Sequence, residues 1–342
     1  MNRCTSLIVL LCFLLAACNE TKSKSSLGSI PQAQLTNHVS EFSVTIDTIV
    51  SPYAPTRITR RIRNTADGDL LLASFTDVLS FDGNIFTPLP SAADSSGFNA
   101  FDALEDTQGT IWIASTHYGV YRYDHGMYTH YTIDNGLANN RTIDIYEDKA
   151  GNIWISSGGG ISRYDGSSWT VYTADDGLPT DDVNRIIQDT KGTYWIGTRS
   201  LACTYDGISF TKITTQDGLA LRNIRHIIED RNGGIWLGGG EGLWYYDGSI
   251  YTQLSQEMMV GIHEDREGVI WTISSHSISY GWQAPDTALN VSTDKTNSVR
   301  HISSPGSVLF GIGEDRDGNI WIGTGNGVLT CNQKSMKIYV RE

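Results

Sequence analysis

Positive charge is scarce in this sequence. Lysine and arginine together number 25, against 38 aspartates and glutamates, and the formal net charge is −13 at pH 7. Binding to a phosphate backbone requires clustered lysine and arginine side chains that displace counterions. Nucleic acid is therefore not expected as a partner.

Proline and long hydrophobic segments are also scarce. The chain has 8 prolines against 35 glycines and 16 tyrosines, which suits many short strands joined by tight turns. No segment has 18 or more consecutive apolar residues, so the sequence predicts no membrane-spanning helix.

The first 17 residues have the pattern of a secretory signal. Arg3 supplies the positive start, and the apolar run from Leu7 to Leu15 is too short to span a bilayer. The run ends in Leu15-Ala16-Ala17-Cys18, which resembles the lipobox of bacterial lipoproteins. This resemblance implies cleavage before Cys18 and lipidation of that cysteine, whereas the alternative is an ordinary secretory peptide with a chance cysteine.

Residues 18–40 are expected to form a lipid-bearing, flexible tether, because they are rich in Ser, Lys, Thr and Gln. Several acyl chains on Cys18 would hold the protein on a membrane surface of the cell envelope. Asn19, rather than an aspartate, after the lipidated cysteine favours the outer membrane by analogy with sorting in enteric bacteria.

A repeated block fills the rest of the chain, and its clearest copy runs from Glu147 to Ile155. A tryptophan marks six copies, and Leu71 takes its place in a degenerate first copy. The markers are Leu71, Trp112, Trp154, Trp195, Trp236, Trp271 and Trp321, with steps of 41, 42, 41, 41, 35 and 50 residues. A period near 40 to 45 residues with four strands per unit is typical of a β-propeller. The sequence therefore predicts an all-β, seven-bladed propeller of four-stranded antiparallel blades over residues 41–342.

The third repeat shows how one blade is expected to form. Its four strands are predicted at 143–147, 152–156, 161–164 and 169–172, with a tight Asp148–Gly151 turn and an Asp165-Gly166 hairpin. Trp154 should point into the core between blades. The last unit supplies its own four strands, so 42–50 are expected to add an extra strand that seals the ring.

Cys203 and Cys331 are the two cysteines that remain after the leader and Cys18. Their repeat positions place them on blades four and seven, which are not neighbours, so they are expected to be buried thiols without a disulfide.

The units resemble the two-component regulator propeller repeat, which combines Gly-Asn-Ile-Trp-Ile-Gly-Thr, Tyr-Asp-Gly and a trailing Asp-Gly-Leu. Here the trailing element stands as Asn135-Gly136-Leu137, Asp176-Gly177-Leu178 and Asp217-Gly218-Leu219. The resemblance covers about residues 57–342 and implies a periplasmic sensor propeller, as in the glycan-sensing hybrid histidine kinases of Bacteroides-type bacteria. No kinase or receiver region follows the repeats, so phosphotransfer by this chain is not expected. Blades six and seven depart from the pattern, with a long insertion at 281–306.

Propeller ligands usually lie at the central funnel, where loops from all blades converge. Two sets of loops reach this face, those joining the second strand to the third and those joining the fourth strand to the next blade. From the first set the sequence nominates His117, Tyr118, Arg199, Glu241 and His276, and from the second Asn140, Arg141, Asp181, Asp182, Arg222 and Asn223. Aromatic and hydrogen-bonding groups suit an oligosaccharide or a small polar ligand. The alternative for each of them is an ordinary solvated loop residue.

The recurrent Glu-Asp pairs are interpreted as structural, because a residue repeated in every blade serves the folding of the blade. His263 with His117 or His276 does not match a zinc motif, and His263 is expected at the opposite end from the funnel. No metal, cofactor or catalytic residue is therefore predicted.

Three functions remain open at this point. The favoured one is a membrane-anchored, non-catalytic ligand-binding or sensor propeller. A protein-interaction scaffold that binds an envelope protein is the second. The third is a metal-dependent enzyme, because the streptogramin lyases resemble this chain in their seven blades and Gly-Asn-Ile-Trp units.

Overall fold

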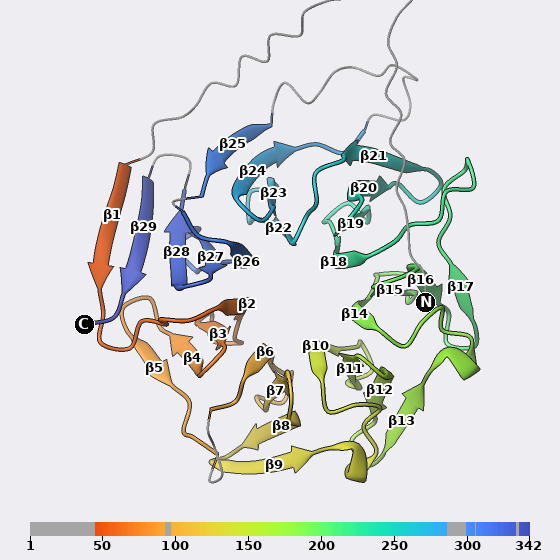
Figure 1. Ribbon diagram of the computed structural model, residues 1–342, viewed down its shortest axis with the longest axis horizontal. Helices are drawn as coiled ribbons and strands as arrows, with labels where there is room; N and C mark the ends of the chain where they lie inside the picture. The colour runs from red at the N-terminus through yellow and green to blue at the C-terminus, as the bar shows by residue number, and fades with distance from the viewer. Residues whose placement is uncertain (1–44, 93–96, 286–298, 305, 333–334) are drawn as a thin grey trace, which may run out of the picture. The chain divides into compact units, whose positions relative to one another are not determined.

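The computed structural model describes residues 45–92, 97–285, 299–304, 306–332 and 335–342. The chain divides into a unit of residues 1–38 and a unit of residues 39–342. The signal segment, Cys18 and the tether predicted at 18–40 lie outside the described residues. Within the second unit, seven sheets stand around a common centre (Figure 1). The predicted seven-bladed propeller is confirmed.

Each blade has four antiparallel strands that follow one another outward from the centre of the ring. Blade one contains β2 (Thr59–Asn64), β3 (Leu70–Ser74), β4 (Val78–Phe81) and β5 (Phe86–Pro88). Blade two contains β6 (Ala100–Glu105), β7 (Ile111–Ser115), β8 (Gly119–Asp124) and β9 (Met127–Tyr131). Blade three contains β10 (Thr142–Glu147), β11 (Ile153–Ser157), β12 (Gly160–Tyr164) and β13 (Trp169–Tyr172). Blades four and five contain β14 (Val183–Gln188), β15 (Tyr194–Thr198), β16 (Cys203–Tyr205) and β17 (Phe210–Lys212); and β18 (Ile224–Glu229), β19 (Ile235–Gly239), β20 (Gly242–Tyr246) and β21 (Tyr251–Ser255). Blades six and seven contain β22 (Gly261–Glu264), β23 (Ile270–Ile273), β24 (Ser277–Trp282) and β25 (Arg300–Ser303); and β26 (Leu309–Glu314), β27 (Ile320–Thr324), β28 (Gly327–Cys331) and β29 (Ser335–Val340).

Short 3-10 turns occupy two of the segments that resemble the trailing Asp-Gly-Leu element. They are η1 (Ile133–Asn135) and η2 (Ala174–Asp176), each preceded by a capping threonine and followed by a glycine in the left-handed region. Much of the insertion in blade six, residues 286–298, lies outside the described residues, and its flanking strands β24 and β25 pair with each other.

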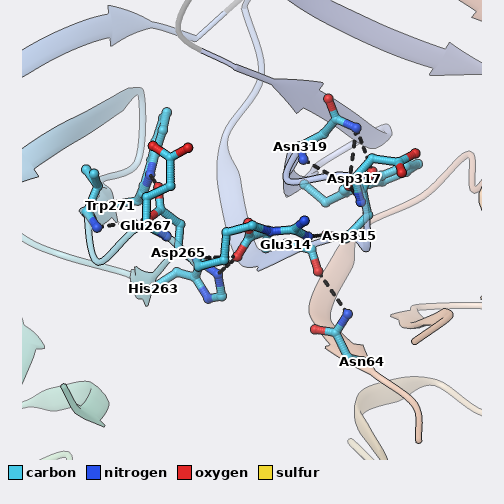
Figure 2. A network of polar contacts seen from close by, with 12 residues as sticks. Asn64, His263, Asp265, Glu267, Trp271, Glu314, Asp315, Asp317 and Asn319 are labelled. Carbon is cyan, nitrogen blue, oxygen red and sulfur yellow. Dashed lines mark hydrogen bonds and ion pairs between the residues drawn. The ribbon is translucent and has the colours of Figure 1, made fainter. Parts of the chain in front are cut away.

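A buried tryptophan and an aspartate fix each of the six complete repeats. The indole N–H of the tryptophan donates to the carboxylate six residues earlier, at 2.7 to 2.9 Å in all six blades. The same aspartate accepts backbone N–H groups of its turn, as Asp148 does from Ala150 and Asn152. Figure 2 shows the sixth-blade pair, Asp265 and Trp271. Leu71 takes the same buried place in blade one.

The glutamate of each Glu-Asp pair joins its blade to the preceding one. Glu147 accepts from the backbone N–H of Thr107 at 2.8 Å, and Glu229 accepts from that of Thr190 at 2.7 Å. Glu314 does the same for Arg266 at 2.9 Å, while its carbonyl oxygen accepts from the Asn64 side chain at 2.9 Å (Figure 2). The structural interpretation of these pairs is therefore confirmed.

The ring is sealed by β1 (Thr45–Val50), which pairs in parallel with β29 as the fifth and outermost strand of blade seven. The chain then enters β2, the innermost strand of blade one, which lies beside β26. The predicted extra strand is thus present over the part of 42–50 that the structure describes. Cys203 and Cys331 are buried free thiols, as expected, and burial raises the pKa of each to about 12.

Candidate functional site

The innermost strands carry a shared irregularity at the centre of the ring. In six blades the pairing of this strand with its neighbour shifts by one residue near the start of the strand, in the manner of a β-bulge. A bulge interrupts the two-residue alternation of a strand and redirects a side chain. The residues at or beside these positions, with Val260 as the seventh, all line one cavity: Arg60, Phe101, Ile143, Asn184, Arg225, Val260 and Phe310.

This cavity, which we call the funnel, has a volume of about 360 Å³. Its other lining residues come from the start of the inner strands, from the loops between blades and from loops that join the second and third strands of a blade: Arg61, Arg141, Asp182, Arg199, Asn223, Met258, Ser275, Val308 and Leu309. The volume falls within the range of small-molecule sites in proteins. Every blade contributes to it, so the funnel exists only when the ring is closed.

The funnel lining is rich in positive charge. It contains five arginines and one aspartate, in a chain whose net charge is −13. Arg199 approaches Asp182 at 3.4 Å. No carboxylate of the described residues forms an ion pair with Arg60, Arg141 or Arg225. Field lines concentrate in such a cleft, which favours ligands of the opposite charge.

Arg60 is half-buried between two aromatic rings. Its guanidinium carbon lies 4.7 Å from the ring centroid of Phe101 and 5.8 Å from that of Phe310. Burial lowers the pKa of Arg60, because its charged form loses hydration. The rings hold the side chain in place and compensate part of this loss through cation–π contact.

A charged network lies beneath the funnel, built from the third residue of successive inner strands. Asp144 accepts from Arg61 at 2.9 Å and from Arg185 at 2.6 Å, and Arg61 contacts His226 Nε2 at 3.0 Å. Burial lowers the pKa of His226 well below its usual value, and the positive charges of Arg185 and Arg61 lower it further, so its imidazole is neutral.

Asp102 extends the network toward blade one. Arg63 donates to both of its oxygens, at 3.0 and 2.5 Å. Burial alone would raise the pKa of Asp102, but the positive charges of Arg63 and Arg61 lower it to about 2. Both buried aspartates are paired, and they tie inner strands of blades one to four together.

The structure brings four of the eleven nominated residues into the funnel, and three of these are Arg141, Arg199 and Asn223. Asp182 joins them in the lining, whereas Asp181 accepts from the backbone N–H of Ala174 at 2.7 Å and so holds η2.

The other six nominated residues do not line the funnel. Asn140 accepts from the backbone N–H of Ile133 at 2.9 Å and thereby holds η1. His117 is exposed, with Nδ1 2.7 Å from the hydroxyl of Thr116. The side chains of Tyr118, Arg222, Glu241 and His276 are also exposed.

The residues at the base of the funnel were missed because they lie on the inner strands, whereas the residues nominated from the sequence all lie in loops. A signal was available, since a charged residue precedes the Glu position by three residues in several blades, as Asp102 precedes Glu105 and Asp144 precedes Glu147. A charged side chain repeated in an inner strand indicates a lined channel rather than an apolar core.

No cluster of three or more His, Cys, Asp or Glu residues within the described ranges is arranged to hold a metal ion. His263 lies next to Glu314, with 3.6 Å between Nε2 and Oε2 (Figure 2), and it does not line the funnel. In the described part of the chain, no helix is long and apolar enough to cross a membrane.

Comparison with protein families identifies the repeats. Four segments, 136–159, 177–200, 218–241 and 303–326, match the two component regulator propeller model. These four segments are two component regulator propeller repeats. In this propeller each of the first three matched segments begins at the glycine of the trailing element, and all four run through the strand that carries the buried tryptophan.

Solved structures share the fold of this propeller. The extracellular domain of a hybrid two component system from B. thetaiotaomicron is 20% identical, with a TM-score of 0.65 over 81% of this chain and 39% of that one. Virginiamycin B lyase from Staphylococcus aureus is 14% identical, with a TM-score of 0.63 over 83% of this chain and 98% of the lyase. PorZ, a surface component of the type-IX secretion system of Porphyromonas gingivalis, is 17% identical, with a TM-score of 0.61 over 82% of this chain and 47% of PorZ.

The propeller thus spans about two fifths of the two-component relative and nearly all of the lyase. At these identities the likeness shows a common fold. A search of curated proteins finds no match.

Proposed function

We propose that this chain is a non-catalytic sensor propeller of the bacterial envelope, which binds an oligosaccharide or another small polar ligand in its central funnel. The observation that carries the proposal is the convergence on a single cavity of one side chain from every blade, in or directly before its inner strand. The four two component regulator propeller repeats support a sensory role over an enzymatic one.

The funnel chemistry supports binding without turnover. Its lining combines arginine and asparagine donors with Phe101 and Phe310, which suits directional polar contacts beside apolar faces. The described part of the lining has no histidine, cysteine, serine–histidine pair or second carboxylate that would supply a nucleophile or a general base.

Thermal unfolding of the purified protein tests this proposal. Oligosaccharides, small metabolites, divalent ions and a no-ligand control form the panel, because a ligand that binds only the folded state raises the midpoint. A rise with a saccharide or metabolite, without its consumption, supports the sensor proposal. Consumption of the ligand contradicts it, and a rise with a divalent ion alone favours a lyase-like enzyme. No rise with any compound favours a scaffold for an envelope protein, to be sought by crosslinking.

Membrane anchoring through Cys18 is the second part of the proposal. It is supported by the sequence Leu15-Ala16-Ala17-Cys18 after a short apolar run. Cells expressing the chain with a labelled fatty acid should incorporate label into the protein and hold it in the membrane fraction, and Cys18→Ala should abolish both. Equal labelling of the Cys18→Ala variant would rule out this anchor.

A further inference from the structure

We infer that the funnel contains an anion subsite, in which Arg60, Arg61 and Arg225 hold a carboxylate, sulfate or phosphate group of the ligand. This inference rests on the proposed function and specifies its ligand chemistry. It is independent of what the rest of the ligand molecule is.

The first argument is the balance of charge. Beneath the funnel, Arg61, Arg63 and Arg185 face Asp102 and Asp144, which leaves one positive charge in excess. His226 adds no further positive charge, because burial lowers its pKa and its imidazole is neutral. At the rim, Asp182 is the one carboxylate among the described lining residues, beside Arg60, Arg141, Arg199 and Arg225. Two successive layers therefore carry uncompensated positive charge in a strongly negative chain.

The second argument is the free-energy cost of burying this excess positive charge. A charged group taken out of water without a partner is destabilising unless an opposite charge or a set of hydrogen bonds replaces its hydration. The buried Nε atoms of Arg60 and Arg185 have no hydrogen-bond partner among the described residues. The rings beside Arg60 compensate it only in part, because cation–π contact leaves its N–H groups unsatisfied. An anion in the funnel supplies the missing acceptor.

The third argument is geometric. The planar guanidinium fork matches the two oxygens of a carboxylate, or two oxygens of a sulfate or phosphate. Arg61 is already held by Asp144 and His226, and Arg60 by Phe101 and Phe310, so little side-chain freedom is lost on binding. Met258, Val260 and Val308 line the same cavity and offer an apolar surface to the remainder of the ligand.

The test uses sulfate and a pair of sugars that differ only at C6, which is a carboxylate in D-galacturonate and a hydroxymethyl group in D-galactose. Each is added at millimolar concentration with the ionic strength held constant by sodium chloride, because high sulfate concentrations stabilise proteins in general. The thermal midpoint and calorimetric binding are measured for the native protein, Arg60→Gln, Arg225→Gln, Arg60→Lys and Lys212→Gln. Lys212 lies exposed on the outermost strand of blade four and serves as the matched loss of charge away from the funnel.

Sulfate and D-galacturonate are expected to raise the midpoint, and D-galactose at the same concentration is not. Arg60→Gln and Arg225→Gln should each weaken binding by about tenfold or more, as expected for the loss of a charge-assisted hydrogen bond. Arg60→Lys should lose less than Arg60→Gln, and Lys212→Gln should match the native protein.

Two results overturn the anion subsite. One is the absence of any effect of sulfate and D-galacturonate beyond that of chloride. The other is native affinity of Arg60→Gln and Arg225→Gln for sulfate and D-galacturonate, which would place the anion elsewhere. If a neutral saccharide still raises the midpoint in either case, the proposed sensor function stands and only its anionic ligand class fails.

Discussion

Trp154 donates its indole N–H to Asp148 at 2.8 Å, and the hydroxyl of Tyr194 in the next blade donates to the same carboxylate oxygen at 2.8 Å. One buried carboxylate therefore fixes a turn, a core side chain and the contact between two blades.

Removal of this carboxylate should destabilise the propeller strongly. Asp148→Ala leaves the buried Trp154 N–H and two turn amides without an acceptor, so the free energy of unfolding should fall by about 3 kcal/mol. Asp165→Ala is the control, because Asp165 caps an exposed hairpin turn and bonds only to Ser167 and Ser168. Urea unfolding followed by tryptophan fluorescence measures both. Equal losses for the two variants would contradict the structural role given to Asp148.

The buried His226 should make stability depend on pH. Burial and the positive charges of Arg185, Arg61 and Arg63 lower its folded-state pKa, whereas its unfolded value lies near 6.5. Below about pH 6.5 the unfolded state therefore binds a proton at His226 that the native state does not. The contribution of the neutral His226 to the free energy of unfolding is complete above about pH 6.5 and is lost as the pH falls below it.

Urea unfolding at pH 7 and pH 5 tests this expectation. His226→Gln should show a smaller loss of stability between the two pH values than the native protein, because it has no proton to take up on unfolding. His125→Gln, at an exposed turn, should retain the native dependence. An unchanged dependence in His226→Gln would show that His226 is not the group responsible.

Cys203 and Cys331 should be unreactive in the folded protein. Burial raises the pKa of both thiols to about 12, so the nucleophilic thiolate is absent near neutral pH and the sulfur atoms are inaccessible. With Cys18 replaced and the leader removed, a thiol reagent should label neither residue in native buffer and both in guanidinium chloride. Rapid labelling of either thiol in native buffer would show that its blade opens locally.

The blades were predictable because their signals are local and repeated. The strand at 169–172 was predicted with its observed bounds, and the other three strands of blade three were within one residue of theirs. Turn aspartates, positive-φ glycines and a buried tryptophan all fall at fixed distances in each unit, so every copy reinforces the same prediction.

The funnel was less predictable because it is a property of the closed ring. Arg141 and Arg199 were found from their loops, but Arg60 and Phe101 reach the cavity through a bulge that breaks strand alternation. No local sequence pattern predicts that bulge. Asn140 was nominated as a ligand residue but is not one of the funnel lining residues. It is a polar loop residue on the expected face, but its side chain accepts a hydrogen bond from a turn.

Ligand binding in the funnel is the central claim, and a cavity-filling variant tests it most directly. Val308 is exposed and lines the funnel, so Val308→Trp should obstruct the cavity without disturbing the core. Ile208→Trp, at an outer hairpin turn where Ile208 is 90% exposed, is the matched control. Calorimetric titration with the compound that raises the thermal midpoint most should give native affinity for Ile208→Trp and affinity weaker by about tenfold or more for Val308→Trp. Native affinity in a folded Val308→Trp protein would contradict the account, because the ligand would then bind outside the funnel.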